Sequence, residues 1–128
     1  MTKYIFLVVA LIGFVSCEKE TSVGYIVKND SSTKIYVSGV NVVYATPISH
    51  IIPALGGSEI LARWSKTGKS LDLMDPTTMF GQDLLITNTN GDTLTKNYAN
   101  IANWDTDVEE TKGTAKHTYV LNVTDADF

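Results

Sequence analysis

Apolar side chains in this chain recur with the spacing of β-strands. Apolar and polar residues alternate between Glu59 and Ser65, and again from His117 to Thr124. No window keeps the 3.6-residue apolar period of an amphipathic helix over a helix-long stretch. Strand-like segments follow one another at intervals of about ten residues with turn formers between them, which is typical of antiparallel sandwiches and barrels. The chain is therefore predicted to be all-β.

Turn-forming residues indicate where the strands end. Asn29–Ser32 is a cluster of turn formers between the first two apolar segments. Asn90-Gly91 is the pair preferred in two-residue type I′ hairpin turns, because both central residues of such a turn need a positive φ. This turn predicts that Thr87 pairs with Leu94. A glycine inside an apolar segment, Gly39, predicts a bulge or a change of strand.

Two stretches are predicted to be connections, not strands. Pro47 and Pro53 bracket a long apolar connection, and residues 97–113 form a polar loop before the last strand. About seven candidate strands remain. They favour an antiparallel Greek-key sandwich of the immunoglobulin-like or transthyretin-like kind, with a small barrel as the alternative. The expected core includes Trp64, on the same face as Ile60 and Ala62. It also includes the inner face of the last strand: His117, Tyr119, Leu121 and Val123.

Residues 1–17 have the parts of an export signal. Lys3 precedes twelve residues without charge, Tyr4–Val15, and Ser16-Cys17 ends this run. At 1.5 Å per residue the run reaches about 18 Å, which is short of the ~30 Å of hydrocarbon that a membrane-spanning helix must cross. Its length suits the apolar region of a secretory signal. The predicted division of the chain is a cleaved signal over 1–16, a polar tether over 17–22 and one β-sandwich domain over 23–128.

Phe14-Val15-Ser16-Cys17 resembles a lipoprotein box, although most such boxes carry leucine where Phe14 stands. In proteins with this box the cysteine sulfur receives a diacylglycerol, and the new amine is often acylated as well. Each buried methylene contributes ~0.8 kcal/mol, so two or three acyl chains such as palmitate anchor a protein firmly. The resemblance implies lipidation at Cys17 and a membrane partner. The alternative is a plain secretory signal in which Cys17 is incidental.

Charge and cysteine content exclude several classes of function. Without Lys3 the chain has nine Lys and Arg against fourteen Asp and Glu. This modest acidic balance argues against a nucleic-acid partner, which needs a clustered basic face. Cys17 is the only cysteine, so an acylated Cys17 leaves no thiol for a disulfide, a nucleophile or a thiolate metal site.

The whole layout resembles the short secreted lipoproteins of Bacteroidetes. The shared features are a cysteine followed by acidic residues, an N-D-S-S turn, an NGDTL hairpin, a late-loop Trp and the final strand HTYVLNVTDADF. The resemblance implies a β-sandwich displayed on an outer membrane. Acidic residues after the cysteine resemble a surface-export signal in that group, and Glu18 and Glu20 fit this loosely. The cell surface is therefore favoured over the periplasmic face.

Asp92-Thr93-Leu94 resembles the O-glycosylation sequon of exported proteins in the same group. Thr93 follows an exposed turn, where a glycosyltransferase has access. The alternative is an ordinary hairpin residue.

Trp104 lies in a polar segment between Asn103 and Asp105. An exposed indole beside amide and carboxylate groups suits sugar binding, because a pyranose stacks on the ring while its hydroxyls are hydrogen-bonded. These three residues are therefore a candidate ligand site. The alternative is that Trp104 folds back and caps one end of the sandwich.

Catalytic and metal-binding patterns are weak. Thr67-Gly68-Lys69-Ser70 lacks the first glycine of a phosphate-binding loop, and the two histidines, His50 and His117, have no nucleophile in a recognisable context. The acidic run from Asp105 to Glu110 does not fit an EF-hand. Oxygen ligands from Asp105 and Asp107 with Asp125 or Asp127 would make a looser calcium site, against which a solvated loop is favoured. We expect no enzyme activity, no cofactor and no metal.

The expected function is that of a non-catalytic envelope protein that captures a glycan or another protein. The alternative is a structural subunit of an envelope complex that pairs with its partner through strand edges.

Overall fold

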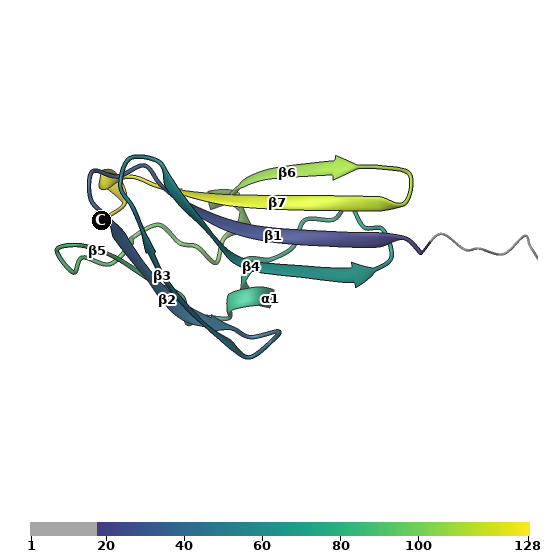
Figure 1. The fold of residues 1–128 in the computed structure, drawn as a ribbon, viewed down its shortest axis with the longest axis horizontal. Coiled ribbons are helices and arrows are strands. Elements are labelled where there is room, and N and C mark those ends of the chain that lie inside the picture. Colours follow the sequence, from purple (N-terminus) through teal and green to yellow (C-terminus); the bar gives the residue numbers. More distant parts are fainter. Residues whose placement is uncertain (1–17) are drawn as a thin grey trace, which may run out of the picture.

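The alternating segments fold into two β-sheets that pack face to face (Figure 1). The computed structural model describes residues 18–128, so the signal predicted over Met1–Ser16 and the lipidation predicted at Cys17 lie outside the described residues. The strands are β1 (Glu20–Asn29), β2 (Ile35–Asn41), β3 (Thr46–Ile52), β4 (Gly57–Thr67), β5 (Leu85–Asn88), β6 (Asp105–Glu110) and β7 (Thr114–Val123). The short helices are α1 (Pro76–Phe80), η2 (Ile101–Asn103) and η3 (Asp125–Asp127).

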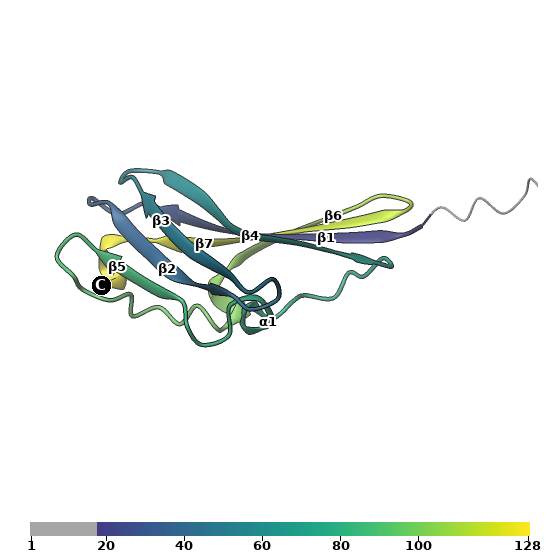
Figure 2. The same cartoon turned by 60° about the horizontal axis from the view of Figure 1, so that its bottom comes forward.

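One sheet has the strand order β4-β1-β7-β6 and the other has β3-β2-β5. Figure 2 shows the three-stranded sheet lying obliquely across part of the four-stranded sheet, with the β6–β7 hairpin extending beyond it. The all-β sandwich is confirmed, and within residues 18–128 the sheets do not close into a barrel. No helix among these residues is long and apolar enough to span a membrane.

The centre of the larger sheet is a parallel pair. β1 is antiparallel to β4 but parallel to β7, from Glu20 opposite Thr114 to Asn29 opposite Val123. The purely antiparallel arrangement expected from the sequence is therefore wrong at this pair. Parallel neighbours need a long crossover, and here the chain between the first and last strands provides it.

The core lies between the inner faces of the two sheets. The predicted inner face of the last strand is confirmed, since His117, Tyr119, Leu121 and Val123 are all buried. An aromatic cluster fills the middle of the core, with the Tyr25 ring stacked on Tyr119 at 5.1 Å and edge-on to Phe80 at 5.2 Å. Burial raises the pKa of Tyr25 far above its ordinary value, and the neighbouring Tyr119 and Asp75 raise it further.

A bulge in β4 changes the predicted alternation. The pairing with β1 shifts between Tyr25 and Ile26, so Ala62 and Ile60 face consecutive β1 residues and Leu61 is extra. Leu61 and Ala62 both point into the core, whereas Ile60 remains 39% exposed. The prediction that Ile60 and Ala62 share one face is therefore wrong, because the bulge lies between them. Trp64 packs against the core but stays partly exposed.

Both predicted connections contain edge strands. The segment between Pro47 and Pro53 belongs to β3, which within residues 18–128 pairs only with β2 and so tolerates Pro47. The predicted polar loop over 97–113 contains β6, whose one partner among the described strands is β7. Gly39 is not at a bulge, since it pairs regularly with Ile48, and the backbone O of Asp83 leaves little room for a side chain there.

The hairpin after β5 has a different turn from the predicted one. Thr87 bridges to Thr93 and not to Leu94, and Asn88 N–H donates to the Asp92 carbonyl at 3.0 Å. Only Gly91 has a positive φ, of 85°. The loop is thus one residue longer than a type I′ turn. The Asn88 side-chain oxygen stabilises this longer loop, because it accepts hydrogen bonds from the backbone N–H groups of Asn90 and Asp92.

The predicted tether over 17–22 is shorter than expected, because β1 begins at Glu20. Thr21 is fully buried, and its hydroxyl donates to the Gly68 carbonyl at 2.6 Å and accepts from Ser70 N–H at 2.8 Å. These bonds fix the segment after β4 to the start of β1. The polar residues at 20–22 predicted a tether, but they form the start of a strand, and the Thr21 hydroxyl makes its hydrogen bonds inside the protein.

Candidate functional site

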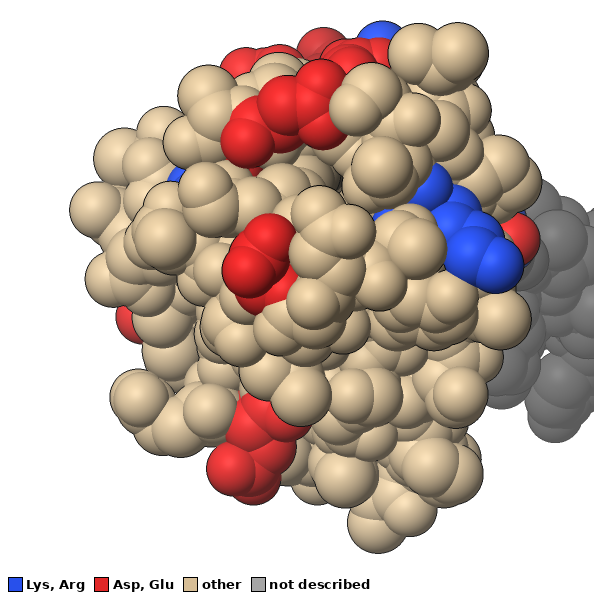
Figure 3. Space-filling view, turned by 90° about the vertical axis from the view of Figure 1, so that its left-hand side faces the viewer, with Lys and Arg blue, Asp and Glu red and all other residues tan. Residues whose placement is uncertain are grey.

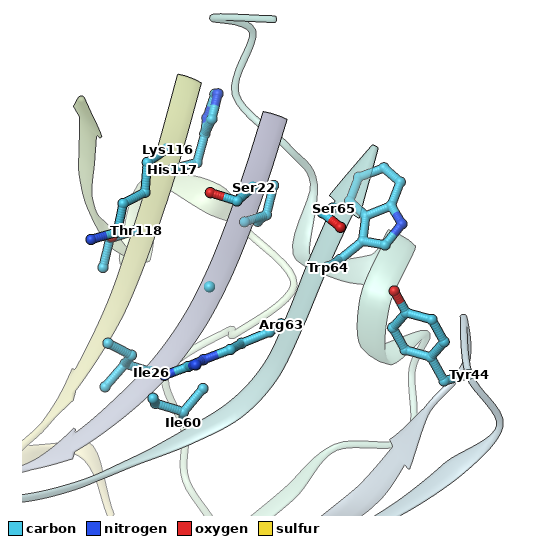
Figure 4. Close-up of a pocket in the computed structure, with 12 residues that line it drawn as sticks. Ser22, Ile26, Tyr44, Ile60, Arg63, Trp64, Ser65, Lys116, His117 and Thr118 are labelled. Carbon is cyan, nitrogen blue, oxygen red and sulfur yellow. The ribbon is translucent and has the colours of Figure 1, made fainter. Parts of the chain in front are cut away.

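A hollow of about 580 Å³ lies over the outer face of the four-stranded sheet and around the edge of β4 (Figure 4). Side chains from three strands meet there because their registers align. The rows across β4, β1 and β7 are Ser65–Ser22–Lys116, Arg63–Gly24–Thr118 and Ile60–Ile26–Val120. We call this hollow the groove, and all of these residues except Val120 line it. Trp64 and Tyr44 extend it beyond β4.

Gly24 forms the floor of the groove. It lies in the middle of a central strand, and a Cβ added at this position would meet no atom within 4 Å. Its φ is not positive, so neither backbone conformation nor close packing requires glycine. Glycine in the middle of a strand costs roughly 0.5–1 kcal/mol relative to alanine. What the missing side chain provides is open space between the β4 and β7 side chains.

Arg63 lies directly opposite Gly24 and reaches across β1 toward Ile26 (Figure 4). It is the only arginine in the sequence. Within residues 18–128 its guanidinium has neither an ion-pair partner nor a hydrogen-bond acceptor, whereas Lys116 on β7 lies 3.9 Å from a carboxylate oxygen of Glu109. The groove therefore carries two cations, and no carboxylate is among its lining residues.

No protein-family model, curated protein or solved structure matches this chain. The geometry of the groove is consequently the basis for assigning a function.

The candidate sugar site around Trp104 is not formed. The indole is only 4% exposed, lies 5.6 Å edge-on from Tyr25, and its Nε1–H donates to the Tyr98 carbonyl at 2.7 Å. A buried ring has no free face on which a pyranose can stack, so the sugar-platform interpretation is wrong. Trp104 folds back into the protein, as in the alternative, and packs in the aromatic cluster against Tyr25 and Phe80. Asn103 donates to the Asn97 carbonyl and Asp105 accepts from Asn122, so these polar groups bind their own chain.

The acidic run forms a strand and not a metal site. Asp105 and Asp107 lie along β6, opposite Val120 and Thr118. Asp125 accepts hydrogen bonds from the backbone and hydroxyl of Ser32. In the described part of the chain no three His, Cys, Asp or Glu side chains are grouped as metal ligands. The looser calcium site is therefore not assembled.

Asp127 closes the C-terminal turn. It pairs with Lys96 at 3.1 Å and accepts from the Thr124 backbone at 2.7 Å. Partial burial raises the pKa of Asp127, but the hydrogen bonds from Thr124 and Lys96 outweigh burial and lower it overall. Other carboxylates are scattered over the end of the molecule that carries the C-terminus (Figure 3).

His117 is held in the core by hydrogen bonds to both of its ring nitrogens. It is 1% exposed, and its Nε2 lies 2.7 Å from the Ser70 carbonyl, which can only accept. Its Nδ1 then accepts from the Tyr119 hydroxyl at 3.0 Å, and this hydroxyl accepts from Met74 N–H at 2.8 Å. Burial raises the pKa of Tyr119, and the Met74 hydrogen bond offsets this in part. The network fastens residues 68–75 to the inner face of the sheet.

The remaining predicted positions lie apart from the groove. His50 is on β3 in the other sheet, 3.9 Å from Glu59. Thr93 is exposed beside its turn, and its glycosylation stays a prediction. Sequence reasoning missed the groove because its residues look ordinary one at a time. The two available signals were a glycine in the middle of a strand, Gly24, and the only arginine, Arg63.

Proposed function

We propose that this protein is a lipid-anchored, non-catalytic capture module of the bacterial cell envelope, and that the groove over Gly24 binds a glycan. The observation that carries the proposal is the open floor at Gly24, in a strand where a side chain would fit and would stabilise the sheet. A cost in stability at the centre of a binding-sized hollow is typical of a functional site.

The dimensions and chemistry of the groove suit a sugar. Its volume of about 580 Å³ falls within the ~300–1,000 Å³ of small-molecule sites. Ser22, Ser65 and Thr118 supply hydroxyls, which both donate and accept hydrogen bonds as sugar hydroxyls do. Ile26 and Ile60 form an apolar wall for the C–H face of a ring. The β4 and β7 strands are separated by two strand spacings, roughly 10 Å, which leaves room for a pyranose.

The lining of the groove supports capture without chemistry. Glycoside hydrolysis uses a pair of carboxyl groups that flank the scissile bond. No Asp or Glu is among the described lining residues, and the one histidine that contributes, His117, has both ring nitrogens engaged.

The anchor is proposed from the residues before the domain. The short apolar run that ends at Cys17 supports an acylated cysteine on the outer membrane, with the cell surface favoured. We expect Cys17→Ser to move the protein from the membrane fraction to the soluble fraction, because the attachment site for the acyl chains is lost. Fractionation with mass spectrometry of the native N-terminus measures this, and Lys19→Ser is the control. An unacylated mature protein that begins at another residue would contradict the anchor.

Gly24→Val tests the groove. Valine fills the floor, so we expect glycan binding to be lost, while the free energy of unfolding rises by about 0.5–1 kcal/mol because a β-branched residue replaces glycine in a strand. A glycan array followed by calorimetry measures binding, and thermal denaturation measures stability. Lys28→Val is the matched control, since Lys28 is a half-exposed residue of the same strand and lies outside the groove.

Unchanged glycan binding by Gly24→Val would contradict the proposal. Self-association in sedimentation velocity would then favour the structural alternative. β4 is an edge strand of eleven residues, paired only with β1 in the described part of the chain, and its free edge is where another strand would add.

A further inference from the structure

We propose further that the captured glycan carries a carboxylate, as a uronic acid does, and that Arg63 binds this group. The inference rests on the proposed capture function and adds the ligand class. Arg63 is paired with Gly24 across β4 and β1, so it lies beside the open space that a side chain at Gly24 would enter. The guanidinium therefore borders the open floor of the groove, where a ligand has to lie.

The guanidinium is available for a ligand. No carboxylate among residues 18–128 pairs with it, although fourteen Asp and Glu stand against ten Lys and Arg in the sequence. The ion pairs of the described residues use lysine or histidine, for example Lys96 with Asp127 and Lys28 with Asp30. The single arginine thus lies in the groove, and no ion pair within residues 18–128 neutralises its charge.

Arginine differs from lysine in the anions that it recognises. Its planar guanidinium donates two parallel hydrogen bonds to a carboxylate, whereas an ammonium is a point charge without this geometry. The hydroxyls of Ser22, Ser65 and Thr118 are left for the neutral hydroxyls of the sugar. The row that holds Arg63 therefore matches a ligand with one anionic edge and several hydroxyls.

The charges around the groove also orient the ligand. Arg63 lies on the β4 side, whereas Asp105, Asp107 and Glu109 lie on β6, next to β7. Like charges repel, so the β6 carboxylates disfavour an acidic group near β7. Lys116 moderates this repulsion through its contact with Glu109. A uronic acid is therefore expected to place its carboxylate on Arg63 and its uncharged side toward Thr118.

The test compares trigalacturonic acid with its methyl ester, which keeps the sugar rings and hydroxyls but carries no negative charge. Isothermal titration calorimetry with the full chain in detergent should show about 10-fold to 100-fold tighter binding of the acid, the range expected for a charge-assisted hydrogen-bonded pair. Arg63→Gln should remove this preference, so that the acid and the ester bind with similar affinity. Arg63→Lys should restore only part of it. Lys28→Gln, which removes a cation outside the groove, should change neither affinity.

The outcomes separate this inference from the function on which it rests. If the acid and the ester bind equally, and Gly24→Val abolishes the binding of both, the carboxylate inference is overturned and glycan capture stands. Binding of neither ligand would also overturn the carboxylate inference, and the glycan array of wild type against Gly24→Val would decide the capture function separately. An acid preference that survives in Arg63→Gln would show that Arg63 does not hold the acidic group.

Discussion

Trp104→Ala should lower the free energy of unfolding by about 3–5 kcal/mol, the loss typical of a buried aromatic residue truncated to alanine. The indole stacks on Phe80 with ring centroids 6.4 Å apart and meets Tyr25 edge-on. Its removal leaves a cavity in the aromatic cluster and deprives the Tyr98 carbonyl of its donor. Urea denaturation followed by circular dichroism measures the change.

Trp64→Ala is the matched control for this prediction. Trp64 is the only other tryptophan, and it is only partly buried, so its truncation should cost roughly half as much or less. A loss below about 1 kcal/mol for Trp104→Ala would contradict the buried position, because a ring that faced solvent would cost little to remove. Glycan binding below the melting temperature should survive Trp104→Ala, since the groove is on the opposite face of the sheet.

Asn29→Ala should cost about 2–4 kcal/mol, because several buried hydrogen bonds are lost at once. The fully buried Asn29 amide donates to the carbonyls of Thr33 at 2.8 Å, Ile52 at 3.2 Å and Pro53 at 3.1 Å. Its side-chain oxygen accepts from the backbone and hydroxyl of Ser31. One side chain thus joins the β1–β2 turn of one layer to the end of β3 in the other.

Asn41→Ala is the control that distinguishes the loss of this link between the layers from the loss of any buried amide. Asn41 is also buried, but its oxygen accepts only from the backbone of Val43 and Tyr44 in its own turn. We expect a cost of about 1 kcal/mol there. Asn29→Asp keeps the acceptor for Ser31 and loses the donors, so it should be nearly as damaging as Asn29→Ala. Equal costs for Asn29→Ala and Asn41→Ala in chemical denaturation would argue against a linking role.

The elements that the sequence predicted well are those with one fully buried face. β7 is paired on both sides, and its inner residues alternate without exception from His117 to Val123. Edge strands show a weaker apolar alternation in their sequence, because one side lacks a neighbouring strand that would help to bury their side chains. β6 has only Val108 partly buried, so its acidic residues resembled a loop. The bulge at Leu61 shifted the alternation in β4, and nothing local announces such a shift.

Long-range pairing limited the prediction of the site. The groove unites β1, β4 and β7 through registers that link Gly24 to Arg63 and to Thr118. No local pattern encodes the parallel pairing of the first strand with the last. Trp104 shows the reverse case, because its polar neighbours suggested exposure while the folding of the whole loop decided its burial. Local patterns therefore predicted the layers of the fold, and distant contacts determined which surface was hollow.

The parallel pair at the centre of the larger sheet has a mechanical consequence for an anchored protein. If Cys17 is acylated as we propose, a pull on the domain would pass through residues 18 and 19 and enter β1 along its own axis. Ladders to β4 and β7 run the full length of that strand, so tension loads them in shear and their bonds must give way together. A strand peeled sideways would instead release its bonds one after another. Drag on a captured glycan would thus be borne by the strand that forms the floor of the groove, between its two longest ladders.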